Sequence, residues 1–186
     1  MEGQLLLKLP TILAADILQR WLDVRASVQL DTAYCKTSVR QDFLDLIRSP
    51  EFSISTWVLD PSGYIKATDN VVGWATIRNV TVEKISLNKD SDLKVYAAFL
   101  KKSPGGVHVI KANQVPFAVI MMKTIAACTN LTVLDLYGCE IPSTLREVFI
   151  ECKNLQEFRY TFMGRADAKK PKKTALKDTD LVGLSC

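Results

Sequence analysis

Two stretches of this chain, Cys128–Leu136 (CTNLTVLDL) and Cys152–Tyr160 (CKNLQEFRY), decide its fold. Both begin with the phrase Cys-x-Asn-Leu, and they start 24 positions apart, at residues 128 and 152. In each copy the leucine is followed by apolar residues at the third and fifth positions beyond it. The alternation Leu134-Asp135-Leu136 is typical of a short strand that buries one face. The two stretches therefore predict a repeated strand.

Earlier parts of the chain carry the same pattern. Copies begin at Val107 and Val82, and a looser copy begins at Ile54. A helical stretch follows each of three copies, with matched apolar positions at Tyr96 and Leu100, Met121 and Ile125, and Leu145 and Phe149. A unit of strand, turn and helix in about 24 residues cannot bury its own face and must stack on its neighbours. We therefore expect parallel strands near residues 82–87, 107–112, 131–136 and 155–160, with helices between them.

The segment Leu131–Ile141, with the pattern L-x-x-L-x-L-x-x-C-x-I, resembles a leucine-rich repeat of the cysteine-containing subtype. Cys128, Cys152 and Cys186 fall near the position where that subtype ends its helix. The resemblance implies an α/β solenoid of short parallel strands alternating with helices over residues 51–163. It also implies that Cys139 satisfies neighbouring backbone groups instead of acting as a nucleophile.

The C-terminal residues 164–186 predict a basic insertion loop and the helix of a last, incomplete repeat. The chain has a net charge of +4, and these residues carry +3 of it. The run Lys169–Lys173 is a solvated loop, a nuclear-localisation signal or a weak anionic contact. A charge concentrated in one such run argues against a nucleic-acid-binding domain. No polar capping repeat is visible, so we expect either that the array is cut at a repeat boundary, which is the leading interpretation, or that its open edge is left for a partner.

Residues 1–50 predict a small helical module. Apolar residues recur at helical spacing in two segments: Ile12, Leu13, Ile17, Leu18, Trp21 and Leu22, and then Phe43, Leu44 and Ile47. Between them, Asp31-Thr32-Ala33 predicts a break between helices.

This module resembles an F-box. The resemblance rests on Leu9-Pro10, then Ile17-Leu18-x-x-Trp21-Leu22, then the segment Val28–Cys35. The family usually has an acidic residue two positions after its leucine-proline, where this chain has Ile12. In that family three helices dock on a Skp-type adaptor of a cullin ubiquitin ligase, and an F-box before leucine-rich repeats is a familiar pairing. The resemblance implies six adaptor-binding residues: Leu9, Pro10, Ile17, Leu18, Trp21 and Leu22. The alternative is a helical cap that covers the apolar edge of the first repeat.

The composition gives little sign of catalysis, cofactors or metals. Of the 186 residues, 48% are hydrophobic and 24% charged, as in an ordinary folded domain. The apolar run Val115–Met122 is far shorter than the roughly 20 residues of a membrane span. Five cysteines without close pairs match neither a zinc site nor a disulfide framework. His108, the single histidine, has no catalytic partner at a suggestive spacing. We therefore expect a non-enzymatic cytoplasmic or nuclear protein without cofactor or metal.

Alternate residues of each predicted strand point away from the core, to the concave face of such a solenoid. The candidate binding residues on this face are Lys111, Asn113, Val133, Asp135, Tyr137 and Arg159. Lys111, Asp135 and Arg159 could equally pair with one another across strands about 4.8 Å apart. Tyr137 is the best anchor, because aromatic residues lead interface hot spots. The leading hypothesis is a substrate receptor that binds a Skp-type adaptor and a substrate protein. The rivals are a plain repeat scaffold without a ubiquitin link and an enzyme with an unrecognised site.

Overall fold

The computed structural model describes the chain in segments: residues 6–22, 24–35, 38–56, 58–59, 65–66, 69–117, 119–140 and 144–161. The predictions for residues 164–186 lie outside these segments. The described chain forms two compact units, Met1–Ser86 and Leu87–Cys186. The strands of the five-stranded sheet run in the order β1-β4-β5-β6-β7, which is the order of the chain. The sequence prediction of an α/β fold with strands alternating with helices is confirmed.

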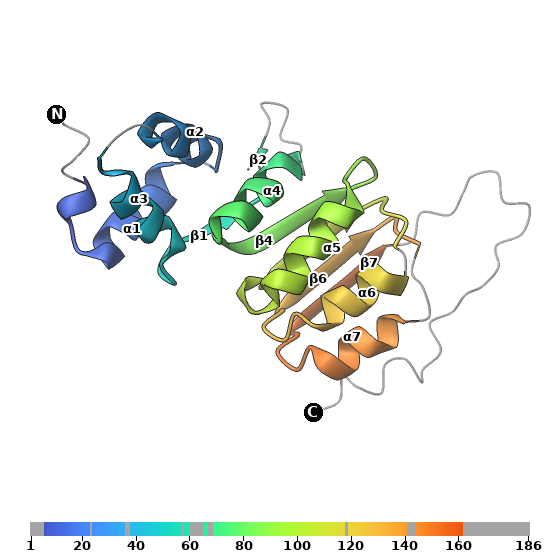
Figure 1. The fold of residues 1–186 in the computed structure, drawn as a ribbon. Coiled ribbons are helices and arrows are strands. Elements are labelled where there is room, and N and C mark those ends of the chain that lie inside the picture. The colour runs from blue at the N-terminus through green and yellow to red at the C-terminus, as the bar shows by residue number, and fades with distance from the viewer. Residues whose placement is uncertain are drawn as a thin grey trace, which may run out of the picture. The chain divides into compact units, whose positions relative to one another are not determined.

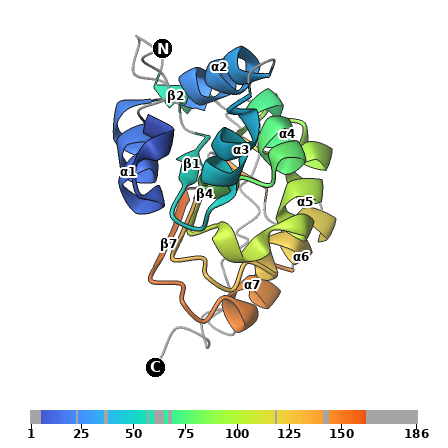
Figure 2. The ribbon, with the colours of Figure 1, turned by 60° about the vertical axis from the view of Figure 1, so that its left-hand side comes forward.

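The second unit contains the repeated strands and their helices. Its elements are α5 (Leu93–Lys102), a 3₁₀ turn (Pro104–Gly106), β5 (Val109–Asn113), α6 (Val119–Ala126), β6 (Val133–Tyr137), α7 (Leu145–Glu151) and β7 (Glu157–Thr161). The pairs β5–β6 and β6–β7 are parallel, as predicted, and each residue pairs with the residue 24 positions later, as Val109 does with Val133 and Val133 with Glu157. The three helices lie side by side along one face of these strands (Figures 1 and 2). These strands begin about two residues later than predicted.

The core of the second unit follows the repeat. Buried positions recur in successive copies, namely Val107, Ile110 and Ala112 in one copy and Leu131, Leu134 and Leu136 in the next. In the last described copy, the matching residues Leu155, Phe158 and Tyr160 are only partly buried. Among the described residues β7 is the edge strand of the sheet, whereas β5 and β6 each have a neighbouring strand on both sides. The apolar side chains of this last copy therefore have fewer neighbours to bury them.

The first unit is mostly helical. Its elements are a 3₁₀ helix η2 (Leu6–Lys8), α1 (Thr11–Trp21), α2 (Val24–Tyr34), α3 (Arg40–Arg48), β1 (Ser53–Ser55), β2 (Val58–Leu59), β3 (Ile65–Lys66), α4 (Asp69–Arg78) and β4 (Thr81–Asn88), whose last two residues belong to the second unit. β1 and β4 are parallel and pair Ile54 with Val82, the positions that the looser repeat copy aligns. An antiparallel β2–β3 pair follows β1, so this copy is not a regular repeat.

The predicted helix break at Asp31–Ala33 is wrong, because these residues lie inside α2. Aspartate and threonine disfavour helix interiors when their side chains compete for backbone groups. The side chain of Asp31 is instead buried against other elements of the first unit. The prediction for the third helix is confirmed, since α3 buries Phe43, Leu44 and Ile47.

Helix α1 forms where the apolar spacing predicts it, but it buries a different set of side chains. Ala14, Ala15 and Leu18 are in the core, whereas Ile12 is 70% exposed and Leu13 is 47% exposed. The small alanine side chains let α1 pack closely in the first unit, which leaves the larger side chains at its N-terminal end in solvent.

Candidate protein-binding surfaces

All six predicted residues of the concave face lie on β5, β6 and β7, on the side of the strands opposite the buried positions. We call this surface the strand face and define it by Lys111, Asn113, Val133, Asp135, Tyr137 and Arg159. The parallel register aligns Lys111 with Asp135 and Asp135 with Arg159, and it places Asn113 beside Tyr137. Asn113, Tyr137 and Arg159 are exposed, and the other three are partly buried.

Two charged residues of the strand face, Asp135 and Arg159, form one of the cross-strand ion pairs that the sequence suggested. The Arg159 guanidinium lies 3.9 Å from the carboxylate of Asp135 and forms a second ion pair with Glu157. The Arg159 side chain is 60% exposed, so these pairs are solvated and contribute little to stability.

Tyr137 is the most prominent apolar group on the strand face. Its side chain is 43% exposed, and its register neighbours are Asn113 and Thr161. Its backbone is held firmly, because its carbonyl oxygen accepts hydrogen bonds from the Gln114 amide at 2.7 Å and from the Cys139 thiol at 3.5 Å. A rigid, exposed tyrosine between small polar neighbours suits a contact with another protein.

Ser86 on β4 is not available as a binding residue. It is buried, and its backbone amide donates to the Thr56 hydroxyl at 2.9 Å.

The buried cysteines of the second unit link neighbouring repeats. The Cys139 thiol donates to the carbonyl oxygen of Ala112 at 3.5 Å, and the Cys152 thiol donates to that of Cys128 at 3.4 Å. Burial raises the pKa of Cys128 to about 12 and that of Cys152 to about 11. Burial also raises the pKa of Cys139. These thiols therefore stay protonated near neutral pH, which fits a structural role and not a nucleophilic one.

Asparagines of the Cys-x-Asn-Leu phrase make a second set of links between repeats. The Asn130 side-chain amide donates to the Gly105 carbonyl at 2.8 Å, and that of Asn154 donates to the Thr129 carbonyl at 3.0 Å. Sequence reasoning used these residues only to find the repeat. Their identical position in both copies was the signal that could have revealed this role.

The six predicted adaptor-binding residues do not share one exposed surface. Leu9 is 37% exposed and Pro10, which precedes α1, is also exposed. Ile17 and Leu22 are partly buried, and Leu18 is in the core. The side chain of Trp21 lies outside the described residues.

Sequence reasoning missed two exposed residues next to Leu9, namely Ile12 and Leu13. With Leu9 they form what we call the module patch. The sequence placed both residues in an apolar helical stretch, but this spacing did not indicate which of its side chains are exposed. Such grouped, exposed apolar side chains often mark an interaction site.

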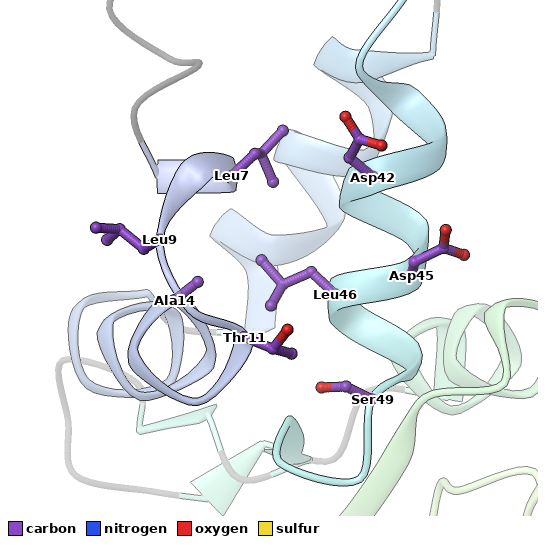
Figure 3. A pocket seen from close by; sticks show the side chains of 8 residues that line it. All are labelled: Leu7, Leu9, Thr11, Ala14, Asp42, Asp45, Leu46 and Ser49. Atoms are coloured by element: carbon purple, nitrogen blue, oxygen red, sulfur yellow. The ribbon is translucent and has the colours of Figure 1, made fainter.

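A small pocket lies beside the module patch, between α3 and the chain from η2 into α1 (Figure 3). Its volume is about 280 Å³. It is lined by Leu7, Leu9, Thr11, Ala14, Asp42, Asp45, Leu46 and Ser49. In Figure 3 the Leu46 side chain points from α3 toward Ala14 and Thr11, and the Asp42 carboxylate lies near Leu7 at one end.

A buried carboxylate holds the helices of the first unit together. Asp31 accepts hydrogen bonds from the Trp74 indole at 2.9 Å and from Arg78 at 2.7 Å, and Arg40 lies 3.5 Å from its other oxygen. Burial acts to raise the pKa of Asp31, but these hydrogen bonds and the two positive charges outweigh it and lower the pKa below its usual value. The carboxylate therefore ties α2 to α3 and α4.

Comparisons with protein-family models, curated proteins and solved structures find no match to this chain. Within the described residues there is no group of three or more His, Cys, Asp or Glu side chains arranged to hold a metal ion. The helices of the described part are all too short or too polar to cross a membrane.

Proposed function

We propose that this chain is a protein-binding adaptor that resembles the substrate receptor of a cullin-type ubiquitin ligase. The observation that carries the proposal is the module patch, because Leu9, Ile12 and Leu13 leave large apolar side chains in solvent at the start of the helical module. A Skp-type adaptor is the partner that the F-box-like order of residues 9–35 suggests. Such a function places the chain in the cytoplasm or nucleus.

In this proposal the helical module contacts the adaptor through a smaller set of residues than the sequence indicated. Leu9 and Pro10 remain candidates with Ile12 and Leu13, since all four are exposed. Leu18 acts through the core of the module, because its side chain is buried. Ile17 and Leu22 are partly buried and can contribute at the edge of the contact.

The strand face is the proposed surface for a substrate protein. Tyr137 would be its anchor, and Arg159 and Asp135 would set the polar contacts around it. Their side chains project from neighbouring parallel strands at fixed spacing, and such a rigid surface loses little freedom on binding.

The second candidate is a leucine-rich-repeat scaffold whose helical module is a cap without any ubiquitin link. The observation that favours it is the Asp31 network, because it fastens α2 to α4, the helix that immediately precedes β4. A cap needs such a fixed attachment, whereas docking to an adaptor does not.

The test is a titration of the full chain with a purified Skp-type adaptor by calorimetry. The variant Leu9→Asp/Ile12→Asp places charges in the module patch. Ile77→Asp is the matched control, because Ile77 is 75% exposed on α4 and lies outside the patch. We expect the wild type and the control to bind the adaptor. The double variant should bind at least about 100-fold more weakly, because charged side chains replace two apolar side chains that become buried in the complex.

Two results would count against adaptor docking. If the wild type shows no binding, the scaffold with a helical cap is the better interpretation. If the double variant, folded by circular dichroism, binds as well as the wild type, the module patch is not the docking surface.

A further inference from the structure

β7 is an edge strand of the five-stranded sheet in the described part of the chain. Its five residues pair with β6 in a regular register without a bulge. At the other edge β1 has only three residues, and its register with β4 shifts between Ile54 and Ser55. Short edge strands, bulges and prolines protect a sheet from pairing with another chain. β7 has none of these protections, so it can accept a further strand.

The outer side of β7 carries backbone groups that point away from β6. The Glu157 amide donates to the Thr132 carbonyl at 3.0 Å, toward β6. On the same side, the Thr161 carbonyl accepts from the Gly138 amide at 2.7 Å. Because the backbone groups of successive strand residues point to alternate sides in the plane of the sheet, the N–H and C=O groups of Phe158 point to the open side. They are available to an antiparallel strand, since the described residues provide no strand there.

The side chains of β7 are complementary to a second copy of the same strand. Glu157, like Arg159, lies on the side of β7 that belongs to the strand face. In an antiparallel pair, residues directly opposite each other point to the same face of the sheet. When the two Phe158 residues lie opposite each other, Glu157 of each copy therefore lies opposite Arg159 of the other. Two pairs of opposite charge then connect the two edges.

The other antiparallel registers of two β7 strands lack this complementarity. With Phe158 opposite Tyr160, the two Arg159 residues lie opposite each other, and with Glu157 opposite Glu157 two carboxylates meet. Like charges directly opposite one another destabilise a sheet. With Tyr160 opposite Tyr160, Arg159 lies opposite the uncharged Thr161. The charge pattern therefore selects one register.

We propose that two copies of this chain associate through β7 in this register, so that the sheet continues from one copy into the other. The twofold axis passes between the two Phe158 residues, perpendicular to the sheet, and both α7 helices lie on the same side of it. Phe158 is only partly buried in one copy, and the association covers its ring. The ring is held in position by an edge-on contact with Phe149 of α7, with 4.9 Å between the centroids. The proposal does not depend on the adaptor.

The interface is small, so the dimer is weak. A strand of five residues is about 17 Å long, and pairing two such strands covers less than the roughly 1,200 Å² of a stable interface. We therefore expect a dissociation constant between about 10 and 1,000 μM, as in transient complexes. In dilute solution the chain is then mostly monomeric.

Sedimentation equilibrium of the full chain from about 5 to 500 μM tests the proposal, with a reductant because Cys35 is exposed. Glu157→Arg and Arg159→Glu each place like charges opposite one another, and each should raise the dissociation constant at least about tenfold. An equimolar mixture of these two variants should associate about as tightly as the wild type, because every cation then lies opposite a carboxylate. Asp90→Arg and Lys89→Glu are the matched controls in the exposed turn between β4 and α5, and each should associate as the wild type does.

Three results would overturn the proposal. A wild type that remains monomeric over the whole concentration range would do so, and the edge would then be left for residues 164–186 or for a strand of another protein. Association that neither Glu157→Arg nor Arg159→Glu weakens would also overturn it. So would a mixture of these two variants, both folded by circular dichroism, that does not associate. No adaptor is present in these measurements, so the proposed function is tested separately.

Discussion

The repeats of the second unit and the helical part of the first unit are held together by different kinds of contact. Between β5, β6 and β7 the same links recur every 24 residues, such as the Asn130 and Asn154 amides that bind the preceding repeat. In the first unit a single carboxylate, that of Asp31, joins three helices. In the second unit each repeated link contributes a small part of the free energy of unfolding. In the first unit several contacts depend on the one side chain of Asp31. The two regions should therefore respond very differently to single substitutions.

The largest effect is expected in the second unit at alkaline pH. The pKa of Cys128 is raised from about 9 to about 12 and that of Cys152 to about 11. At a pH between the thiol pKa of the unfolded chain and the raised pKa of the folded chain, the unfolded chain has lost thiol protons that the folded chain keeps. The free energy of unfolding therefore falls as the pH rises through this window. Each thiol contributes about 1.4 kcal/mol of loss per pH unit in that window.

Urea unfolding at pH 8 to 11 measures this dependence, with Cys128→Ala/Cys152→Ala as the comparison. The double variant should be less stable at pH 8 but should lose stability less steeply above pH 9. If the two proteins have the same slope, the thiols do not titrate as described.

The next largest effect is expected at Asp31. Replacing it with asparagine removes the charge between Arg40 and Arg78 and leaves their guanidinium groups without a counterion. Breaking such a buried pair costs about 3 kcal/mol, whereas Asp16→Asn, which removes an exposed pair with Arg20, should cost less than about 0.5 kcal/mol. Urea unfolding at pH 7 measures both. Equal costs would show that the Asp31 network does not hold the helices of the first unit together.

The same network predicts a loss of stability in acid. Because the folded pKa of Asp31 is below its usual value of 3.8, its contribution is complete above that value. It is lost as the pH falls through the lowered folded pKa. The stabilities of the wild type and of Asp31→Asn, measured by acid unfolding, should therefore converge as the pH falls through the lowered folded pKa of Asp31. A difference between them that does not shrink at any pH below 3.8 would contradict this account.

A smaller effect is expected at the repeated asparagines. Asn130→Ala and Asn154→Ala should each lower the free energy of unfolding by about 1 kcal/mol, because each removes one hydrogen bond to a backbone carbonyl. The two costs should agree within about 0.5 kcal/mol, since the residues occupy equivalent positions. Lys153→Ala, at an exposed position of the same phrase, is the control and should be neutral. Unequal costs would show that the two copies are not structurally equivalent.

The smallest effect on stability is expected on the strand face. Arg159→Ala removes two solvated ion pairs and should change the free energy of unfolding by less than about 0.5 kcal/mol. Thermal unfolding at low and high salt measures this directly. A loss above 1 kcal/mol would mean that the pairs with Asp135 and Glu157 serve the fold, which would weaken the case for a binding surface.

The contrast between the two units also decides what the sequence could predict. The parallel strands and their register followed from local information, because the alternation at Leu134 and Leu136 recurs at a constant spacing. The network at Asp31 could not be predicted, since its partners Trp74 and Arg78 lie 43 and 47 residues away in the chain. A lone aspartate with such distant partners looks the same in sequence as one that ends a helix.

Of the two candidate surfaces, one could be predicted from the sequence and the other could not. The strand face was predictable because the strand alternation assigns Tyr137 and Arg159 to the side opposite the core. The module patch was not, because helical spacing alone does not say which apolar residues of α1 are buried. Ala14 and Ala15 take the inner positions and leave Ile12 and Leu13 outside. The pocket beside the patch needs the packing of η2 against α3, which no local pattern describes.

The most direct test of the proposed division between the two regions is hydrogen exchange of the full chain, measured by mass spectrometry with and without a Skp-type adaptor. The account predicts slower exchange on binding in residues 6–22 and 40–48, which contain the module patch and the pocket. It predicts no change of exchange in β5, β6 and β7, because the strand face is proposed to bind a substrate protein and not the adaptor. Slower exchange in these strands with none in the helical module would contradict the account, as would the absence of any change.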